Sequence, residues 1–190
     1  MEKENVITQE KELFRRIENW AQERNFFDAG GATLGDQILK LGEEFGELTK
    51  HAVRSEDIKD DLGDMLVVLV IVAKLAGTDL VECVRVNKSE NIFETIIKEC
   101  ENKEYFENTL NTIKPEVLQI MQYMGDLASA FFQNDDLKEP LSNILVGLVI
   151  CAKLAGTTLQ HCGEIAYNEI RPRKGKFIDG VFVKEADLNQ

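Results

Sequence analysis

The stretch MLVVLVIVAKLAG, residues 65–77, decides the fold class of this chain. It is apolar without interruption from Met65 to Ala73, and a second stretch, ILVGLVICAKLAG at 144–156, has the same length and nearly the same letters. Both runs are far shorter than the roughly 20 apolar residues that a helix needs to cross a bilayer. We therefore interpret both as helices buried in a protein core and expect no membrane partner.

The second stretch belongs to an internal duplication. The sequence KLAGT at 74–78 recurs at 153–157, and the offset of 79 residues extends without a gap, so that 46–83 and 125–162 share 18 of 38 residues. This identity is too high for shared helical composition alone. We divide the chain into a first repeat, residues 1–100, and a second repeat, residues 101–190, joined in the polar stretch from about 89 to 114.

Apolar periodicity and turn residues predict an all-α chain. The expected helices cover 7–25, 34–54, about 58–76, a segment from about 79, and then 116–133, 137–155 and 158–170. After Pro172 the pattern changes, because Asp179-Gly180 separates two short apolar segments within 176–183. That dipeptide between apolar segments is typical of a β-hairpin, so we expect a short hairpin to close the chain.

The net charge limits the possible partners. At -12, the chain lacks the clustered basic surface that a nucleic-acid-binding protein needs, so we expect no nucleic acid partner. No signal peptide pattern precedes Trp20, and we expect a cytoplasmic location. The four cysteines lack CxxC spacing, and His51 and His161 are too isolated in the sequence to suggest a zinc site.

Two carboxylate pairs carry most of the functional information. Glu44 and Glu47 form the first pair, and Asp61 and Asp64 form the second, each with i, i+3 spacing that places both side chains on one helix face. If the two helices pack together, four carboxylates converge. Oxygen donors of this kind suit Mg²⁺, with Mn²⁺ as a possible substitute, while waters and substrate phosphates complete the shell. The pairs therefore predict phosphate chemistry.

The second repeat has lost most of these acids. At the offset of 79, the four carboxylates correspond to Tyr123, Asp126, Pro140 and Asn143. The reverse holds for the tail, where Asn168, Arg171, Arg173 and Lys174 correspond to Ser89, Ile92, Glu94 and Thr95 in the first repeat. We infer one composite site, in which the first repeat holds the metal and the basic tail of the second closes over the phosphates.

These residues resemble a family. The pattern Glu43-Glu44-x-x-Glu47, followed by Asp61-x-x-Asp64, resembles the EExxE…ExxD signature of the MazG-like all-α nucleoside triphosphate pyrophosphohydrolases. Asp61 stands where that family usually has Glu. Such enzymes cleave a nucleoside triphosphate, NTP or dNTP, to monophosphate and pyrophosphate with Mg²⁺. The all-α dUTPases share the four-helix core and the metal carboxylates, so a dUTPase-like specificity stays open.

The resemblance covers nearly the whole chain. Segments 167–175 and 180–185 are similar to the C-terminus of single-repeat, phage-type members, and Trp20, Arg24-Asn25 and Gln37-x-x-Lys40 to their N-terminal part. Single-repeat members assemble as dimers or dimers of dimers. The resemblance thus implies two tandem MazG-like repeats packed as an intrachain pseudo-dimer around a four-helix-bundle core, with further pairing into a homodimer of pseudo-dimers possible.

The expected roles follow from charge and from the resemblance. Glu44, Glu47, Asp61 and Asp64 would hold one or two Mg²⁺ ions, and one of them, or Glu43, would orient the attacking water. The expected substrate-binding residues are Trp20, Asn25, Gln37, Lys40, Asn168, Arg171, Arg173 and Lys174. Among these, Lys40 and the tail cations would contact phosphates. Trp20 would stack on a base or belong to the core, and Gln37 and Asn168 are equally readable as ordinary polar helix residues.

Two alternatives from other classes stay open. One is a helical nucleotide-binding or regulatory module that keeps the fold and has lost catalysis. The other is an acidic cation-binding helical protein without a nucleotide function, against which the basic tail argues.

Overall fold

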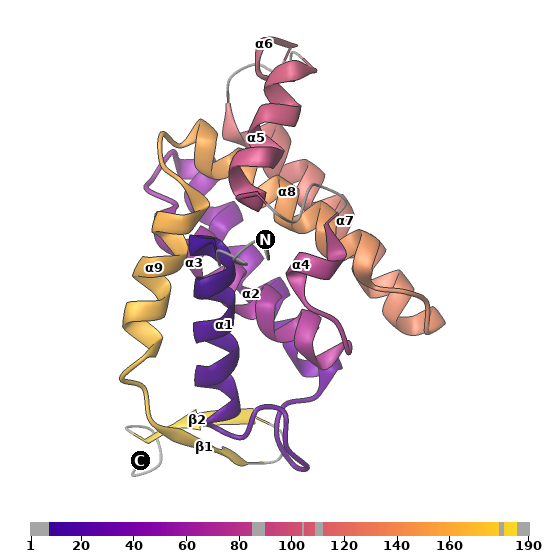
Figure 1. Cartoon of the computed structure of the whole chain (residues 1–190), viewed down its shortest axis with the longest axis vertical. Coiled ribbons are helices and arrows are strands. Elements are labelled where there is room, and N and C mark those ends of the chain that lie inside the picture. Colours follow the sequence, from indigo (N-terminus) through magenta and orange to yellow (C-terminus); the bar gives the residue numbers. More distant parts are fainter. Residues whose placement is uncertain (1–7, 85–89, 104, 109–111, 179–180, 186–190) are drawn as a thin grey trace, which may run out of the picture.

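The computed structural model describes residues 8–84, 90–103, 105–108, 112–178 and 181–185 (Figure 1). Within them the chain is helical apart from one small antiparallel hairpin, which confirms the predicted all-α class and the closing hairpin. The elements are α1 (Gln9–Gln22), α2 (Leu34–Arg54), α3 (Lys59–Leu75), α4 (Leu80–Cys83), α5 (Ile92–Asn102), α6 (Tyr105–Asn108), α7 (Ile113–Gln133), α8 (Lys138–Leu154), α9 (Leu159–Ile170), β1 (Gly175–Ile178) and β2 (Val181–Lys184).

The duplicated sequence folds into two matching helical hairpins. Helices α7 and α8 begin and end 79 residues after α2 and α3. Both turns start with a left-handed residue, Ser55 with φ 57° and Asn134 with φ 54°, which ends the first helix of each hairpin. The chain also leaves α3 and α8 through equivalent left-handed glycines, Gly77 and Gly156.

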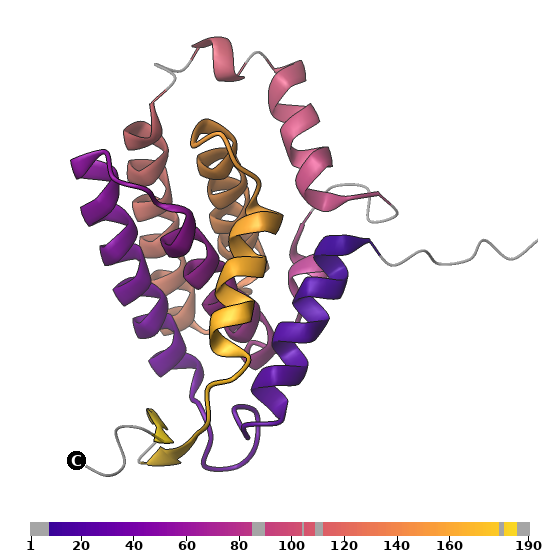
Figure 2. The same cartoon turned by 90° about the vertical axis from the view of Figure 1, so that its left-hand side faces the viewer.

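The two apolar helices, α3 and α8, form the centre of the molecule. They contact each other, and each also packs on a helix from the other half of the chain: α3 on α9, and α8 on α4 (Figure 2). A Cβ atom at Gly63 would lie 2.3 Å from the Cys162 carbonyl oxygen, so the α3–α9 crossing depends on that glycine. Helices α2 and α7 contact each other beside this core.

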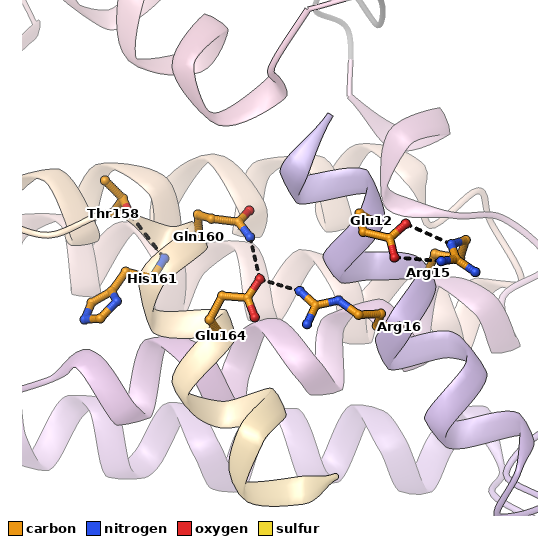
Figure 3. Close-up of polar contacts among 7 residues, drawn as sticks. All are labelled: Glu12, Arg15, Arg16, Thr158, Gln160, His161 and Glu164. Atoms are coloured by element: carbon orange, nitrogen blue, oxygen red, sulfur yellow. Dashed lines mark hydrogen bonds and ion pairs between the residues drawn. The ribbon is translucent and has the colours of Figure 1, made fainter. Parts of the chain in front are cut away.

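Helix α1 is fixed to α9 by a polar network (Figure 3). The Arg16 guanidinium donates to the Glu164 carboxylate, which also accepts a 2.9 Å hydrogen bond from Gln160 Nε2. The Arg16 guanidinium carbon lies 4.7 Å from the centre of the Tyr167 ring. These contacts hold the first helix against the last one, although about 150 residues separate them in sequence.

Three boundaries differ from the sequence prediction. Helix α1 ends at Gln22 rather than at Asn25, because the chain turns there and Asn25 adopts φ 61°; its predicted first residue, Ile7, lies outside the described residues. The stretch from 89 to 114 contains α5, α6 and the start of α7, since Ile92, Phe93 and Ile96 bury an apolar face. The helix expected from 79 has only four residues.

The hairpin pairs Gly175 with Lys184 and Ile178 with Val181; the predicted Asp179-Gly180 turn lies outside the described residues. Phe177 and Phe182 pack on Phe26, and Phe182 also packs on Trp20. This aromatic cluster attaches the C-terminal hairpin to the N-terminal helix.

Among the described residues, no helix taken alone is long and apolar enough to cross a membrane. Helices α8 and α9 pass a test of length and composition only when taken together, and they are bent by 102°.

Candidate functional site

A cavity of about 480 Å³ lies between α1, α2, α3 and the segment that follows α9. It collects polar side chains from α2 and α3 on one side and from the C-terminal tail on the other. Its lining residues are Trp20, Phe26, Asp36, Gln37, Leu39, Lys40, Glu43, Glu44, Asp64, Val67, Val68, Ile71, Ile170, Arg173 and Phe182. Seven predicted site residues meet here: Trp20, Gln37, Lys40, Glu43, Glu44, Asp64 and Arg173.

Lys40 and Glu44 form an ion pair at the wall of this cavity. Lys40 Nζ lies 2.7 Å from Glu44 Oε1 and 3.0 Å from Glu43 Oε2, as the i, i+4 and i, i+3 spacings on one helix allow. Glu44 is 7% exposed. Burial lowers the pKa of Lys40, but the hydrogen bonds to Glu44 and Glu43 outweigh it, so that pKa lies above its ordinary value. Lys40 therefore holds Glu44 in its charged form.

Asp64 faces this pair from α3. Burial, followed by the negative charge of Glu44, raises the pKa of Asp64 to about 7, although the positive charge of Arg173 acts in the opposite direction. The carboxyl of Asp64 thus lies within the electrostatic reach of an acid from α2 and of a base from the tail. Helices from both ends of the chain converge on this one group.

Asp61 has a partner that the sequence did not reveal. His51 Nδ1 lies 2.8 Å from Asp61 Oδ2 and 2.9 Å from Oδ1, across the turn between α2 and α3. Burial raises the pKa of Asp61, and His51 opposes that shift. Sequence reasoning set His51 aside as isolated. Its position ten residues before Asp61, at the end of a helical hairpin, was the signal that could have found it.

The four predicted ligands come as two pairs. Glu44 acts on Asp64, and Glu47 acts on Asp61, as their effects on the two aspartate pKa values indicate. Across the described parts of the chain, no three His, Cys, Asp or Glu side chains are grouped so that they could hold a metal ion. The expected convergence of all four carboxylates is therefore not present in the structure, in which Lys40 and His51 neutralise one acid of each pair.

The basic tail contributes one side chain to the cavity. Arg173 lines it, with Nη2 at 3.6 Å from Glu169 Oε2. The tail backbone is fixed by Arg24, which donates to the carbonyl oxygens of Arg173 at 2.8 Å and Arg171 at 3.0 Å. The Arg171 side chain is exposed and is not part of the cavity lining.

Lys174 and Asn25 line a different cavity. Its volume is about 540 Å³, and it lies between the loop after α1 and strand β1. Asn168 is exposed on α9 and lines neither of these two cavities. The structure thus brings together about half of the predicted substrate-binding residues, because the chain changes direction after Pro172 and successive tail side chains point to different sides.

Trp20 belongs to the cavity wall and to the core. It is 6% exposed, and its indole Nε1 donates a 2.9 Å hydrogen bond to the Ile170 carbonyl oxygen. The Arg24 guanidinium carbon lies 4.8 Å from the centre of the indole. With both its N–H and its face already in contact with protein, Trp20 offers the cavity an apolar wall rather than a free stacking surface.

The equivalent region of the second repeat has different chemistry. Glu116 stands at the position of Gln37 and Tyr123 at that of Glu44. Glu116 is 4% exposed and accepts a 2.5 Å hydrogen bond from Tyr105 Oη on α6. Burial raises the pKa of Glu116. A tyrosine–carboxyl contact under α6 thus replaces the lysine–carboxyl contact of the first repeat.

Comparison with known proteins gives a limited result. No family model matches the chain, and no solved structure matches it. Part of the chain is 41% identical over 73 residues to the "Uncharacterized 18.2 kDa protein in rep-hol intergenic region" of Haemophilus phage HP1 (strain HP1c1). That match covers 37% of this chain and 44% of the phage protein, so the chain spans less than half the length of the curated relative that it matches.

Proposed function

We propose that the chain is a Mg²⁺-dependent nucleoside triphosphate pyrophosphohydrolase of the MazG-like all-α type, which releases pyrophosphate and a nucleoside monophosphate. The observation that carries this proposal is the composition of the 480 Å³ cavity. Glu44 and Asp64 from the first repeat share it with Arg173 from the tail of the second, and Trp20, Phe26 and Phe182 supply an apolar wall. Acids, a phosphate-binding base and an aromatic wall are what a metal-bound nucleotide requires.

The charge of the cavity supports a divalent cation. Asp36, Glu43, Glu44 and Asp64 outnumber Lys40 and Arg173, so a bare triphosphate would be repelled. The donor set fits Mg²⁺, which proteins usually hold through one or two carboxylates together with waters and substrate phosphates. Glu44 and Asp64 are the two carboxylates that lie in the cavity itself, with Glu47 and Asp61 behind them. The bound ion would neutralise phosphate charge during cleavage.

The remaining steps belong to side chains of this chain. Arg173 grips the phosphates through its planar fork, and Lys40 exchanges its contact with Glu44 for a phosphate oxygen. Glu43, which is exposed beside Lys40, accepts a proton from the attacking water. The water oxygen forms the new P–O bond, and the bond between the α- and β-phosphates breaks to release pyrophosphate. The apolar wall excludes water from one side of the reaction.

We also infer that the molecule consists of two tandem MazG-like repeats, residues 1–100 and 101–190, arranged as an intrachain pseudo-dimer. The equal bounds of the two helical hairpins and the exchange of α9 and α4 between α3 and α8 support this arrangement. Because the second repeat keeps Asp126 alone of the four acids, only the first repeat supplies metal ligands.

Pyrophosphate release from a panel of NTPs and dNTPs, dUTP included, tests the proposal. Wild-type chain with Mg²⁺ or Mn²⁺ should release pyrophosphate, and Asp64→Asn should abolish the release. Asp126→Asn, a matched change at the equivalent of Glu47 in the second repeat, should leave it unchanged. If no triphosphate is consumed but one binds, the catalytically decayed binding module is correct. The ion pair of Lys40 with Glu44 favours that second candidate, since it occupies one of the proposed ligands.

A further inference from the structure

Exposed apolar side chains concentrate on two neighbouring helices. Six large apolar residues of the described chain are strongly exposed, and five of them belong to α2 or α7. These are Leu39 at 75%, Val53 at 64%, Leu118 at 64%, Met121 at 47% and Phe132 at 81% exposed. A cluster of this kind differs from the scattered apolar residues of an ordinary surface and marks an interaction site.

The duplication places these residues in register. Leu39 and Leu118 are equivalent, and so are Val53 and Phe132, because each pair is separated by 79 residues. Within α7, Leu118 and Phe132 each lie seven residues from Gly125, so the three residues share one face of the helix. A Cβ atom at Gly125 would meet nothing within 4 Å, and the same holds at Gly42 and Gly46 on α2. The face is therefore shallow and open along its middle.

Helix α7 carries almost no charge. From Val117 to Gln133 its one charged residue is Asp126, whereas 29% of the whole chain is charged. Depletion of charge combined with exposed Leu, Met and Phe is the compositional mark of the central part of a protein interface. The outer flank of α2 differs, because it carries acids at Glu43 and Glu47 and bases farther along, at Lys50 and Arg54.

The two helices form one continuous surface. They lie side by side at the left of Figure 2, outside α3 and α8. They run in opposite directions, since a Cβ atom at Gly35, near the start of α2, would lie 3.4 Å from the ring of Phe131, near the end of α7. The α2–α7 face, as we name the exposed surface of these two helices, therefore presents matching apolar residues from both repeats.

We propose that the α2–α7 face binds the same face of a second copy of this chain, with the two α7 helices antiparallel about Gly125. In that arrangement Leu118 of one copy faces Phe132 of the other, because both residues are seven positions from the twofold axis. The same axis sets the two α2 helices antiparallel, so that the acidic part of one faces Lys50 and Arg54 of the other. A second copy satisfies both the apolar and the charged parts of the face.

A cysteine placed on the axis tests the geometry. In Gly125→Cys the two new thiols lie opposite each other, and mild oxidation should give a covalent dimer on a non-reducing gel. Gln133→Cys is the matched control, since it lies eight residues along the same helix and far from its counterpart. The chain with its four native cysteines gives the background. A crosslink of equal yield at position 133 would refute the antiparallel arrangement.

The mass in solution tests the assembly itself. Sedimentation equilibrium of the whole chain should give twice the mass of one chain, 21.5 kDa, and Leu118→Glu with Phe132→Glu should return the monomer. Ile178→Glu changes the sixth exposed apolar residue, on β1, and should leave the dimer intact. Circular dichroism checks that the double variant keeps its helices. A wild-type chain that sediments as a monomer, or a dimer that survives the double change, would overturn the proposal.

Discussion

His51 Nδ1 lies 2.8 Å from Asp61 Oδ2, and this contact connects the end of α2 to the start of α3. Asp61 is 5% exposed, so its carboxylate depends on that partner. We predict that His51→Ala lowers the free energy of unfolding by about 1–3 kcal/mol at neutral pH, because it leaves a buried acceptor without its donor. Urea denaturation measures the loss. In the Asp61→Asn background the same change should cost less, and an equal cost in both backgrounds would show that the pair is uncoupled.

The pKa of Asp64, about 7, predicts a pH dependence of stability in the absence of metal. A carboxyl with a folded-state pKa above its unfolded value stabilises the fold fully below the unfolded pKa, about 4, and loses that contribution as pH rises through 7. The unfolding free energy of wild type, minus that of Asp64→Asn, should therefore fall between pH 4 and 7 and level off above. Urea denaturation across this range measures the difference. A difference that rises with pH would contradict the assigned shift.

Metal binding should reverse this dependence. Because a ligand carboxylate must be deprotonated, Mg²⁺ should raise the melting temperature more at pH 8 than at pH 6. We expect the increase to disappear in Asp64→Asn and to persist in Asp126→Asn. Differential scanning fluorimetry with millimolar MgCl₂ measures it. An increase of the same size in all three chains would place the ion elsewhere.

The sequence predicted the helices well wherever local chemistry ends them. The bounds of α2 came out as expected, since Thr33 caps its first turn and Ser55 terminates it in the left-handed conformation. Helix α5 escaped prediction, because the polar stretch around it hid the short apolar face of Ile92, Phe93 and Ile96. Local signals define where a helix stops, but they carry less information where burial comes from distant residues.

The candidate site was predictable in part for the same reason. The i, i+4 contact of Lys40 with Glu44 follows from helix geometry. Contacts across turns and between chain ends do not follow from spacing, so the pairing of His51 with Asp61 was missed. The tail was also treated as one basic unit, whereas the structure directs Arg173 and Lys174 into different cavities.

That difference between tail residues gives a kinetic prediction. Arg173→Ala should lower kcat/KM for pyrophosphate release about tenfold to a hundredfold, since a hydrogen bond to a charged group contributes about 1.5–3 kcal/mol. Arg171→Ala is the matched control and should have little effect, because the Arg171 side chain is not part of the cavity lining. Steady-state kinetics with the preferred triphosphate measures both. If Arg171→Ala costs as much as Arg173→Ala, the tail acts as a diffuse basic patch rather than through one residue.

The last prediction concerns the acid that the second repeat has buried under α6. Tyr105 Oη donates to Glu116 Oε2, a bond that lowers the pKa of Glu116 against the stronger effect of burial. Tyr105→Phe removes it and raises that pKa further. The loss of unfolding free energy should therefore be larger at pH 7, where the unfolded carboxyl is ionised, than at pH 4, where both states are largely protonated. Urea denaturation at the two pH values measures the losses, and the pH dependence should vanish in a Glu116→Gln background. If the loss stays equal at both pH values in the Glu116 chain, Tyr105 does not act on the charge of that carboxyl.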